Sequence, residues 1–295
     1  MKCLVGFIVA GTLVSTGIID LHLRARGFHN AREAELISQS ATGAAVRLND
    51  DDLRIVVDAR HPPFSAIGRF RGTMTCTAAI VLDPRIIVTA SHCIADKEGI
   101  LKDVPFIFEQ GYQEGHALGR FRARLWSIGS RQHFKTESVK EASEDWAILL
   151  LDTAPLGVQP FALSLETAQA LKSRNSQMLM PSYSIDFAKA ESISLDPACS
   201  VRDFAWDVLV HNCRASFGSS GAPLLIRRGQ EYAVAGVHTG SLYASDNEGR
   251  AGKLIGNRAI SSHNFAPELV ALSNFLKTGH YDAPISGTPQ NYAIR

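Results

Sequence analysis

Three short segments of the sequence carry side chains that could together cleave an acyl bond. Ser220 lies in a glycine-serine turn, His92 follows an apolar run, and Asp145 comes directly before another apolar run. A serine hydroxyl is a weak nucleophile at neutral pH, so it needs a base beside it. His92 could accept the hydroxyl proton and return it to the leaving group. Asp145 could fix the imidazole tautomer and stabilise its protonated form.

The glycines near Ser220 bear on the same reaction. Gly218 and Gly221 allow a tight turn that brings backbone N–H groups close to a substrate oxygen. The amides of Gly218 and Ser220 could then stabilise the negative charge on a carbonyl oxygen under attack. Taken singly, each segment also has a purely structural explanation: a turn, a histidine beside a strand, and an aspartate before a strand. Only the combination of the three predicts nucleophilic hydrolysis.

From Leu53 onward the sequence consists of short apolar runs separated by turns. Runs of this length and composition predict strands. The predicted strands are Leu53–Val57, Phe64–Phe70, Thr75–Leu82, Ile86–Thr89, Val104–Glu109, Leu118–Ile128, Trp146–Leu151, Ser176–Ser184, Ser192–Val201, Trp206–Val210, Pro223–Ile226, Ala233–Thr239 and Leu254–Ile260. Many short strands with little helix between them favour an all-β sandwich or barrel.

One helix is predicted near the C-terminus. Pro267 suits its first turn, and an apolar stripe follows on one face. The stripe consists of Leu269, Val270, Leu272, Phe275 and Leu276. Gly279 ends the helix, so residues 279–295 are predicted to be a C-terminal tail, loosely ordered from Pro284 onward.

The N-terminus resembles an export signal. Residues 3–19 carry no charge and are mostly apolar, and Asp20 ends the run. This run is short for a membrane span, which needs about 20 apolar residues, and it has the length of a signal-peptide core. Residues 1–19 are therefore predicted to be a signal peptide, with an uncleaved anchor as the alternative. Residues 20–52 could be a propeptide, a linker or the start of the mature chain.

The overall charge excludes some partners. Among 295 residues, 30 are Lys or Arg and 29 are Asp or Glu, which leaves a formal net charge of +1. This balance argues against a broad nucleic-acid-binding surface. The sequence has neither a C-x-x-C pair nor an H-E-x-x-H motif, so we expect no metal and no cofactor. A monomer without a membrane contact in its mature form is predicted, unless the N-terminal segment stays as an anchor.

The three segments resemble the signature regions of the chymotrypsin/trypsin-like serine proteases. These are the T-A-x-H-C, D-x-A-hydrophobic-L and G-x-S-G-x-P blocks, and they occur here in the order of that family. The resemblance covers about residues 53–278. It implies an all-β protein with two six-stranded antiparallel β-barrels, the active site between them and a C-terminal α-helix. It also implies a secreted or periplasmic endopeptidase that acts on proteins or peptides through an acyl-enzyme.

The resemblance also gives the cysteines an interpretation. The family commonly has a disulfide beside the catalytic histidine, where Cys76 and Cys93 lie, and Cys199 and Cys213 are the remaining pair. Each bridge would close a loop of about 15 residues and contribute on the order of 3 kcal/mol. Bridges need an oxidising compartment, in agreement with export. The fifth cysteine, Cys3, belongs to the export segment.

The chain departs from the animal digestive enzymes at Ser219. Those enzymes carry an aspartate there, which pairs with a new N-terminus released by cleavage. Since the sequence also lacks an I-V-G-G-like start before Leu53, activation by such an ion pair is not expected. The G-S-S-G-A-P version is most similar to the bacterial glutamyl-endopeptidase (V8-like) branch.

Two residues match positions around the first specificity pocket of the family. Arg214 lies six residues before Ser220, and His238 matches a histidine that glutamate-specific members use. Arginine pairs well with carboxylates, and histidine can assist, so a preference for acidic residues before the cleaved bond is predicted. Thr239 and Ser241 would line the same wall. Alternatively, Arg214 points to solvent and His238 is a structural strand residue.

Two other functions compete with a protease. The first is a catalytically inactive binding or scaffold protein of the same fold, although the chain keeps all three candidate catalytic residues and Gly218. The second is an esterase of the α/β-hydrolase fold, which requires G-x-S-x-G and places the histidine last. Here Ala222 occupies the final glycine position and His92 precedes Ser220, so the esterase is disfavoured.

Overall fold

The computed structural model describes residues 52–95, 100–101, 104–130, 142–173, 178–245 and 251–280. The predicted export segment at residues 1–19 and the tail from residue 281 lie outside these ranges, as does all of the segment at 20–52 except Asp52. In the described part of the chain, no helix is long and apolar enough to span a membrane.

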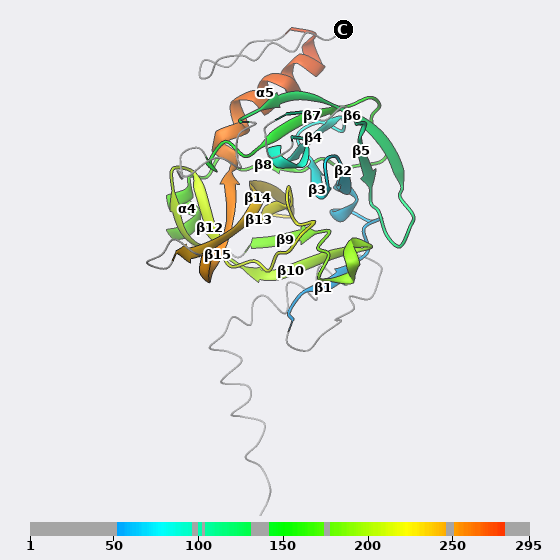
Figure 1. The fold of residues 1–295 in the computed structure, drawn as a ribbon. Coiled ribbons are helices and arrows are strands. Elements are labelled where there is room, and N and C mark those ends of the chain that lie inside the picture. The colour runs from blue at the N-terminus through cyan, green and yellow to red at the C-terminus, as the bar shows by residue number, and fades with distance from the viewer. Residues whose placement is uncertain are drawn as a thin grey trace, which may run out of the picture.

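The N-terminal half forms a closed antiparallel barrel (Figure 1). Its strands are β2 (Ile67–Arg71), β3 (Thr75–Ile80), β4 (Ile86–Thr89), β5 (Phe106–Gln110), β6 (Gly119–Ile128) and β7 (Ala147–Leu151). They pair in the order β2-β3-β4-β7-β6-β5, and β5 pairs back with β2. β4 and β7 are apolar along nearly their whole length and are largely buried, because they form the centre of the hydrophobic core.

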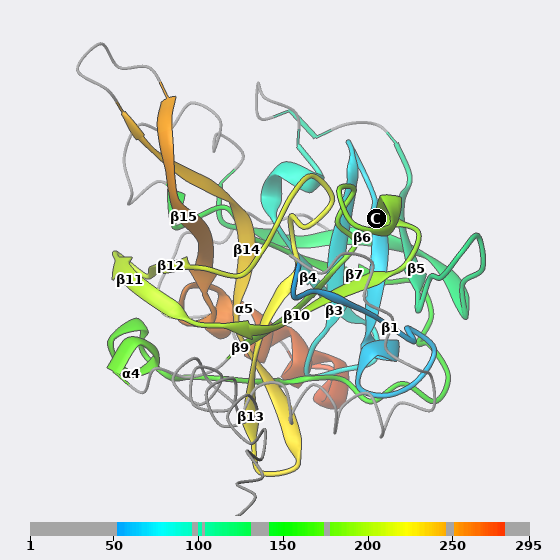
Figure 2. The ribbon, with the colours of Figure 1, turned by 90° about the horizontal axis from the view of Figure 1, so that it is seen from below.

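The C-terminal half is a curved sheet of nine strands. They are β1 (Ile55–Val57), β8 (Ala162–Leu163), β9 (Met178–Ser182), β10 (Ile193–Cys199), β11 (Val201–Ala205), β12 (Val208–His211), β13 (Pro223–Arg228), β14 (Glu231–Ser245) and β15 (Ala251–Ser261). The order is β1-β10-β9-β13-β14-β15-β12-β11, and the short β8 pairs parallel to β14. β14 and β15 are longer than predicted and form a twisted hairpin that reaches beyond the sheet (Figure 2).

The predicted fold class is confirmed, with one difference in the second half. The two-barrel expectation assigned six strands to each half, whereas the second half has nine strands and its pairing path does not close. One reason is that β1, the first described strand, does not join the first barrel. It pairs antiparallel with β10, with Ile55 opposite Leu195.

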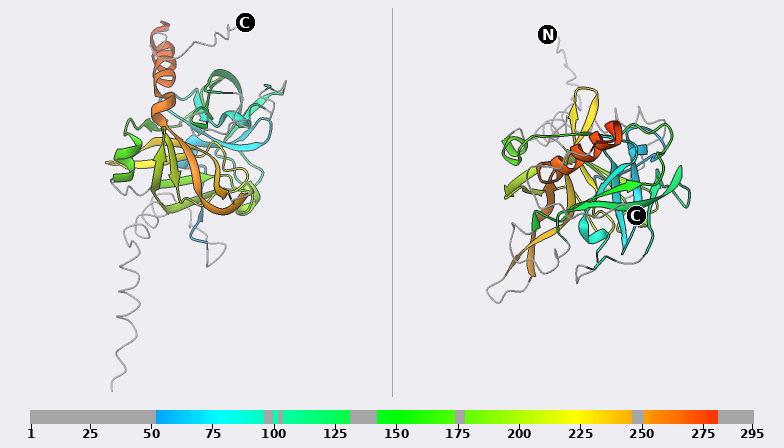
Figure 3. Two further views of the ribbon diagram at one scale, coloured as in Figure 1. Left: turned by 60° about the vertical axis from the view of Figure 1, so that its left-hand side comes forward. Right: turned by 90° about the horizontal axis from the view of Figure 1, so that it is seen from above.

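A C-terminal helix, α5 (Ser262–Thr278), packs where the two halves meet (Figure 3). Phe275 stacks on Trp126 of β6, and Phe265 contacts Trp146 just before β7. The helix begins one turn earlier than predicted, because the Ser261 side chain accepts a hydrogen bond from the backbone of His263 and caps it. It ends at Gly279 as predicted, in the left-handed conformation. A second short helix, α4 (Ala168–Ser173), was not predicted.

Candidate active site

Strand pairing brings His92 and Asp145 together. His92 lies in a 3₁₀ turn directly after β4, and Asp145 lies directly before β7. Because β4 and β7 are antiparallel, with Thr89 opposite Ala147, the end of one strand meets the start of the other. His92 Nδ1 is 2.9 Å from Asp145 Oδ2 and 3.1 Å from Oδ1, and the His92 backbone N–H donates to Oδ1 at 3.2 Å. Asp145 is fully buried and His92 nearly so.

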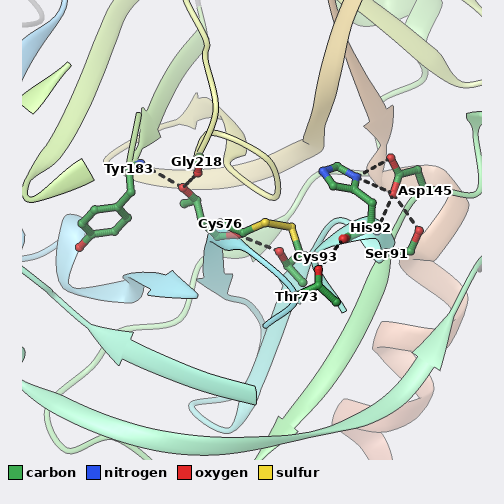
Figure 4. Close-up of a disulfide and its surroundings, with 10 residues drawn as sticks. Thr73, Cys76, Ser91, His92, Cys93, Asp145, Tyr183 and Gly218 are labelled. Atoms are coloured by element: carbon green, nitrogen blue, oxygen red, sulfur yellow. Dashed lines mark hydrogen bonds and ion pairs between the residues drawn. A yellow bond between two sulfur atoms is a disulfide. The ribbon is translucent and has the colours of Figure 1, made fainter. Parts of the chain in front are cut away.

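Three further contacts hold this pair (Figure 4). Ser91 Oγ donates to Asp145 Oδ1 at 2.8 Å, which gives the buried carboxylate another donor. Thr73 Oγ1 donates to the His92 carbonyl at 3.1 Å. The disulfide Cys76–Cys93 joins the histidine turn to β3. Although these two cysteines and His92 lie close enough to bind a metal ion, their sulfurs are bonded to each other and are therefore not thiolate ligands.

The loop of Ser220 lies between β12 and β13 and is bonded to both halves of the protein. The backbone N–H of Thr77 donates to the Ser220 carbonyl at 2.8 Å, and Thr77 Oγ1 donates to the Gly218 carbonyl at 2.8 Å. The Gly221 N–H donates to the His238 carbonyl at 2.8 Å. The loop that carries Ser220 therefore contacts β3, the strand that the Cys76–Cys93 disulfide joins to the histidine turn.

Only glycine fits at positions 218 and 221. Both residues have positive φ, +92° and +83°. A Cβ atom would lie 2.1 Å from the Tyr183 carbonyl oxygen at Gly218, and 2.1 Å from the Thr77 carbonyl oxygen at Gly221. These glycines thus permit the close approach that the sequence predicts.

The amides of Gly218 and Ser220 are available as donors. Neither N–H donates a hydrogen bond within the described part of the chain. The Phe217 carbonyl accepts from the Ile185 N–H at 2.8 Å. Because a trans peptide unit is planar, the Gly218 N–H points the opposite way from that carbonyl, away from Ile185. This arrangement leaves two backbone donors on one short loop.

Ser219 is buried in a cluster of serine hydroxyls. Its Oγ bonds to the Oγ atoms of Ser184 and Ser182, and Ser182 in turn bonds to Ser194. The Ser216 N–H donates to Ser219 Oγ at 3.2 Å, and the Ser219 N–H donates to the Ser216 carbonyl at 3.0 Å. Neutral hydroxyls therefore hold the loop at the position where the digestive enzymes have a charged aspartate.

Arg214 has an acidic partner that the sequence does not reveal. Its side chain is half exposed, and Nη1 lies 3.5 Å from Asp52 Oδ1. Its backbone N–H donates to Asp196 Oδ2 at 2.7 Å. The sequence suggested either a residue at the base of the specificity pocket or a solvent-facing side chain. Neither interpretation includes this ion pair, because Asp52 comes close to Arg214 only through the pairing of β1 with β10.

A second polar group beside Arg214 was not predicted. Asn257 Nδ2 donates to the Cys213 carbonyl at 2.7 Å, and Asn257 Oδ1 accepts from Ser241 Oγ at 2.7 Å. The disulfide Cys199–Cys213 fixes the same segment. Asn257 lies on β15 opposite Ser241 of β14, so only the register of these strands identifies it.

His238 is buried against a second histidine, His211 of β12. The Cys213 N–H donates to His211 Nδ1 at 3.2 Å, so the proton of this ring lies on Nε2. Nε2 faces His238 Nδ1 at 3.1 Å and donates to it, which leaves the proton of His238 on its own Nε2. His238 thus presents a neutral N–H donor, and its Nε2 has no hydrogen-bond partner among the described residues.

Both imidazoles are held neutral. Burial lowers the pKa of His211 to about 3. Burial likewise lowers the pKa of His238 well below its ordinary value, and the neighbouring His211 and His92 lower it further. A neutral histidine at position 238 can donate one hydrogen bond to a substrate group, but it supplies no positive charge before the substrate binds.

Two side-chain groups next to His238 lack hydrogen-bond partners among the described residues. Thr239 is buried, and its hydroxyl bonds to no described group. The Nε atom of Arg258 on β15 is also buried without a partner. Its guanidinium stands over Gly240, where a Cβ atom would lie 3.6 Å from Nε. Arg258 therefore adds a cation to the β14 wall that the sequence analysis missed, because Arg258 reaches Gly240 only through strand register.

Comparison with known proteins identifies the family. Residues 76–236 match the sequence profile of the trypsin-like peptidase domain, and since this is more than half of the chain, the chain belongs to that family. Among solved structures, a Glu endopeptidase in complex with MPD has a similar fold, with a TM-score of 0.58 and 18% sequence identity over 78% of this chain and 99% of the other. The protease Anisep from Arthrobacter nicotinovorans gives 0.48 and 17%, over 67% and 90%. Comparison with curated protein sequences gives no significant match. By its family, the protein is a serine endopeptidase.

Proposed function

We propose that the protein is a secreted serine endopeptidase in which Ser220 forms the acyl-enzyme. The observation that carries the proposal is the buried His92–Asp145 pair, combined with a glycine loop in which the Gly218 and Ser220 N–H groups donate no hydrogen bond to a described residue. Ser220 Oγ attacks the substrate carbonyl carbon while His92 Nε2 takes its proton. The amides of Gly218 and Ser220 stabilise the oxyanion.

The remaining steps use the same groups. The C–N bond breaks, and His92 gives the proton to the leaving amine. Water then attacks the acyl-enzyme while His92 acts as base again, and Ser220 regains its proton as the acid leaves. Asp145 accepts from Nδ1–H, and this tautomer places the lone pair that acts as the base on Nε2. Ser91, which donates to the same carboxylate, helps to hold its orientation.

We also propose export to an oxidising compartment. The two disulfides, Cys76–Cys93 and Cys199–Cys213, support it, because disulfides persist mainly outside the cytosol. The uncharged run at residues 3–19 supports it independently. A periplasmic or extracellular enzyme follows, which acts on protein or peptide substrates.

The proposed substrate class is peptides with an acidic residue before the cleaved bond. Two groups support it: the half-exposed Arg214 guanidinium and the Nε2–H of His238, which has no hydrogen-bond partner among the described residues. Ser241 and Thr239 continue the wall beside His238. Because Asp52 already pairs with Arg214, a substrate carboxylate has to share or displace that contact, which favours a moderate rather than an absolute preference.

The experiment is hydrolysis of matched peptides by the purified enzyme and its Ser220→Ala and His92→Ala variants. Loss of turnover in both variants, with Ser173→Ala on α4 as active control, is the expected result. Residual activity equal to that of the unmutated enzyme in Ser220→Ala would contradict the assignment of the nucleophile. No turnover by any of the proteins would favour the binding or scaffold alternative. Cleavage mainly after Lys, Arg or large apolar residues would contradict the acidic preference alone.

A further inference from the structure

Arg54, at the start of the described chain, forms ion pairs with the buried Asp52 and the half-exposed Asp186. Its side chain is only 5% exposed. Nε and Nη2 donate to the Asp52 carboxylate at 2.6–3.1 Å, and Nη1 and Nη2 donate to the two oxygens of Asp186 at 2.9 and 3.0 Å. The guanidinium also stands 4.8 Å from the centre of the Phe187 ring. One arginine thus joins two acidic groups that are distant in sequence.

Both carboxylates of this network, Asp52 and Asp186, are ionised at neutral pH because their pKa values are lowered. Burial alone would raise the pKa of Asp186, but hydrogen bonds from Arg54 and Ser216 outweigh it and hold the pKa below its ordinary value. The pKa of Asp52 is also lowered, because the bonds from Arg54 outweigh its burial. Arg54 directly precedes Ile55, so the pairing of β1 with β10 fixes the position of the Arg54 backbone. The network is therefore a fixed feature of the C-terminal half at neutral pH.

Asp186 connects this network to the loop of Ser220. Asp186 Oδ1 accepts from Ser216 Oγ at 2.6 Å, and the Asp186 N–H donates to the same Oγ at 3.2 Å. One residue earlier, the Ile185 N–H donates to the Phe217 carbonyl at 2.8 Å. Ser216 exchanges two hydrogen bonds with Ser219, as described above. The segment immediately before Gly218 is thus held by residues 185 and 186.

The orientation of one peptide unit depends on this contact. The Phe217 carbonyl and the Gly218 N–H belong to the same planar trans unit, so the bond from Ile185 sets the direction of the Gly218 N–H. Glycine tolerates many backbone conformations, and Gly218 has a φ of +92°. The backbone torsions of Gly218 therefore do little to fix the orientation of the Phe217–Gly218 peptide unit. Within the loop, Ser216 Oγ lies 3.2 Å from the same Phe217 carbonyl oxygen, and from outside the loop the Ile185 N–H donates to it. Residues 185 and 186 therefore anchor this unit both directly and through Ser216.

We propose that Arg54 is a positioning residue that orients the Gly218 amide of the oxyanion hole through Asp186 and the 216–217 backbone. This inference rests on the proposed function, in which that amide stabilises the oxyanion. A buried internal guanidinium then performs the task that a released N-terminus performs in the digestive enzymes. Ser219, a neutral residue, needs no charged partner. The active enzyme accordingly includes the segment from Asp52 onward, whether or not residues 20–51 are removed by proteolysis.

The test compares Arg54→Met and Arg54→Lys with the unmutated enzyme, with active sites titrated by a fluorophosphonate. Arg60→Met is the matched control, because Arg60 bonds to Asp58 two residues earlier, as Arg54 does to Asp52, but is 58% exposed and contacts no described part of the loop. Loss of a whole oxyanion donor lowers kcat about 10²–10³-fold. We expect Arg54→Met to lower kcat per titrated site at least about tenfold, and Arg54→Lys to lower it less. Because Asp52 also pairs with Arg214, KM should change little only for peptides without an acidic residue before the cleaved bond.

A purely structural role has a different signature. It reduces the number of titrated sites and the resistance to urea, but leaves kcat per site unchanged. A kcat per site within twofold of the unmutated value in Arg54→Met would therefore overturn the proposal. If that variant does not fold, Ser216→Ala, which removes the hydroxyl link and no buried charge, decides by the same criterion. A tetrahedral peptide boronate should lose affinity in parallel with kcat. Retained activity in Ser220→Ala would instead contradict the proposed function itself.

Discussion

The buried histidine pair predicts a loss of stability in mild acid. His211 is fully buried, and its pKa is lowered from 6.5 to about 3. Between these two values the unfolded chain binds a proton at this position and the folded chain does not. The unfolded state therefore gains free energy from protonation as the pH falls, and the stability that neutral His211 retains above pH 6.5 is lost progressively toward the folded pKa.

The magnitude follows from the linkage relation. Each pH unit between the two pKa values costs about 1.4 kcal/mol, so His211 lowers the free energy of unfolding by about 2 kcal/mol between pH 7 and pH 5. In His211→Gln this contribution disappears. We expect the difference in stability between the two pH values to shrink by about 2 kcal/mol, even though the variant is less stable than the parent at pH 7.

The assay is urea unfolding followed by tryptophan fluorescence at pH 7 and pH 5, without reductant. All proteins carry Ser220→Ala, so that autolysis does not distort the curves. His116→Gln is the control, because His116 is exposed and its described hydrogen bonds use only its backbone. An unchanged pH difference in His211→Gln would refute the claim that this imidazole is held neutral by burial.

Three further predictions concern single elements of the site. Gly221→Ala should lower the free energy of unfolding by about 2–5 kcal/mol in urea titrations, because its Cβ would collide with the Thr77 carbonyl at a positive φ; an unaffected midpoint would contradict the described loop. Replacing both Cys199 and Cys213 with Ser should cost about 3 kcal/mol in the same assay, and a loss near zero would mean that the bridge does not restrain the unfolded chain. Asp145→Asn should lower kcat about 10⁴-fold at neutral pH, because an amide stabilises the wrong tautomer of the histidine; a loss below tenfold in steady-state kinetics would exclude the orienting role.

The parts of the site that could be predicted from the sequence are local. Gly218 and Gly221 stand where the backbone requires positive φ, and this requirement acts on single residues. His92 and Asp145 each follow or precede a strand, and the strands themselves are recognisable from their apolar runs. The motifs therefore carried enough information to single out the Ser220 loop and the neighbouring positions of His92 and Asp145.

The parts that could not be predicted depend on strand register over long separations. Arg54 and Asp186 are separated by 132 residues and meet only because β1 joins the sheet of the other half. His211 meets His238 because β15 lies between β12 and β14, which puts both rings on one face. The local sequence pattern predicts neither the pairing of β1 with β10 nor the order β12-β15-β14.

The proposed preference for acidic peptides also depends on contacts between distant segments. The sequence singled out Arg214 by its distance from Ser220, but the structure adds Asp52 as its partner and places Arg258 over Gly240. In the proposed pocket, the charge that a substrate meets is the sum of all three groups, and they come from three distant segments.

The most direct test of the central claim is to map where a fluorophosphonate reacts. The purified protein is labelled at neutral pH and digested, and the modified peptide is sequenced by mass spectrometry, beside Ser220→Ala and His92→Ala. The mechanism predicts one adduct, on Ser220, which is absent from Ser220→Ala and forms far more slowly in His92→Ala. No adduct on the unmutated protein, or an adduct on any other serine, would contradict the assignment of Ser220 as a nucleophile activated by His92.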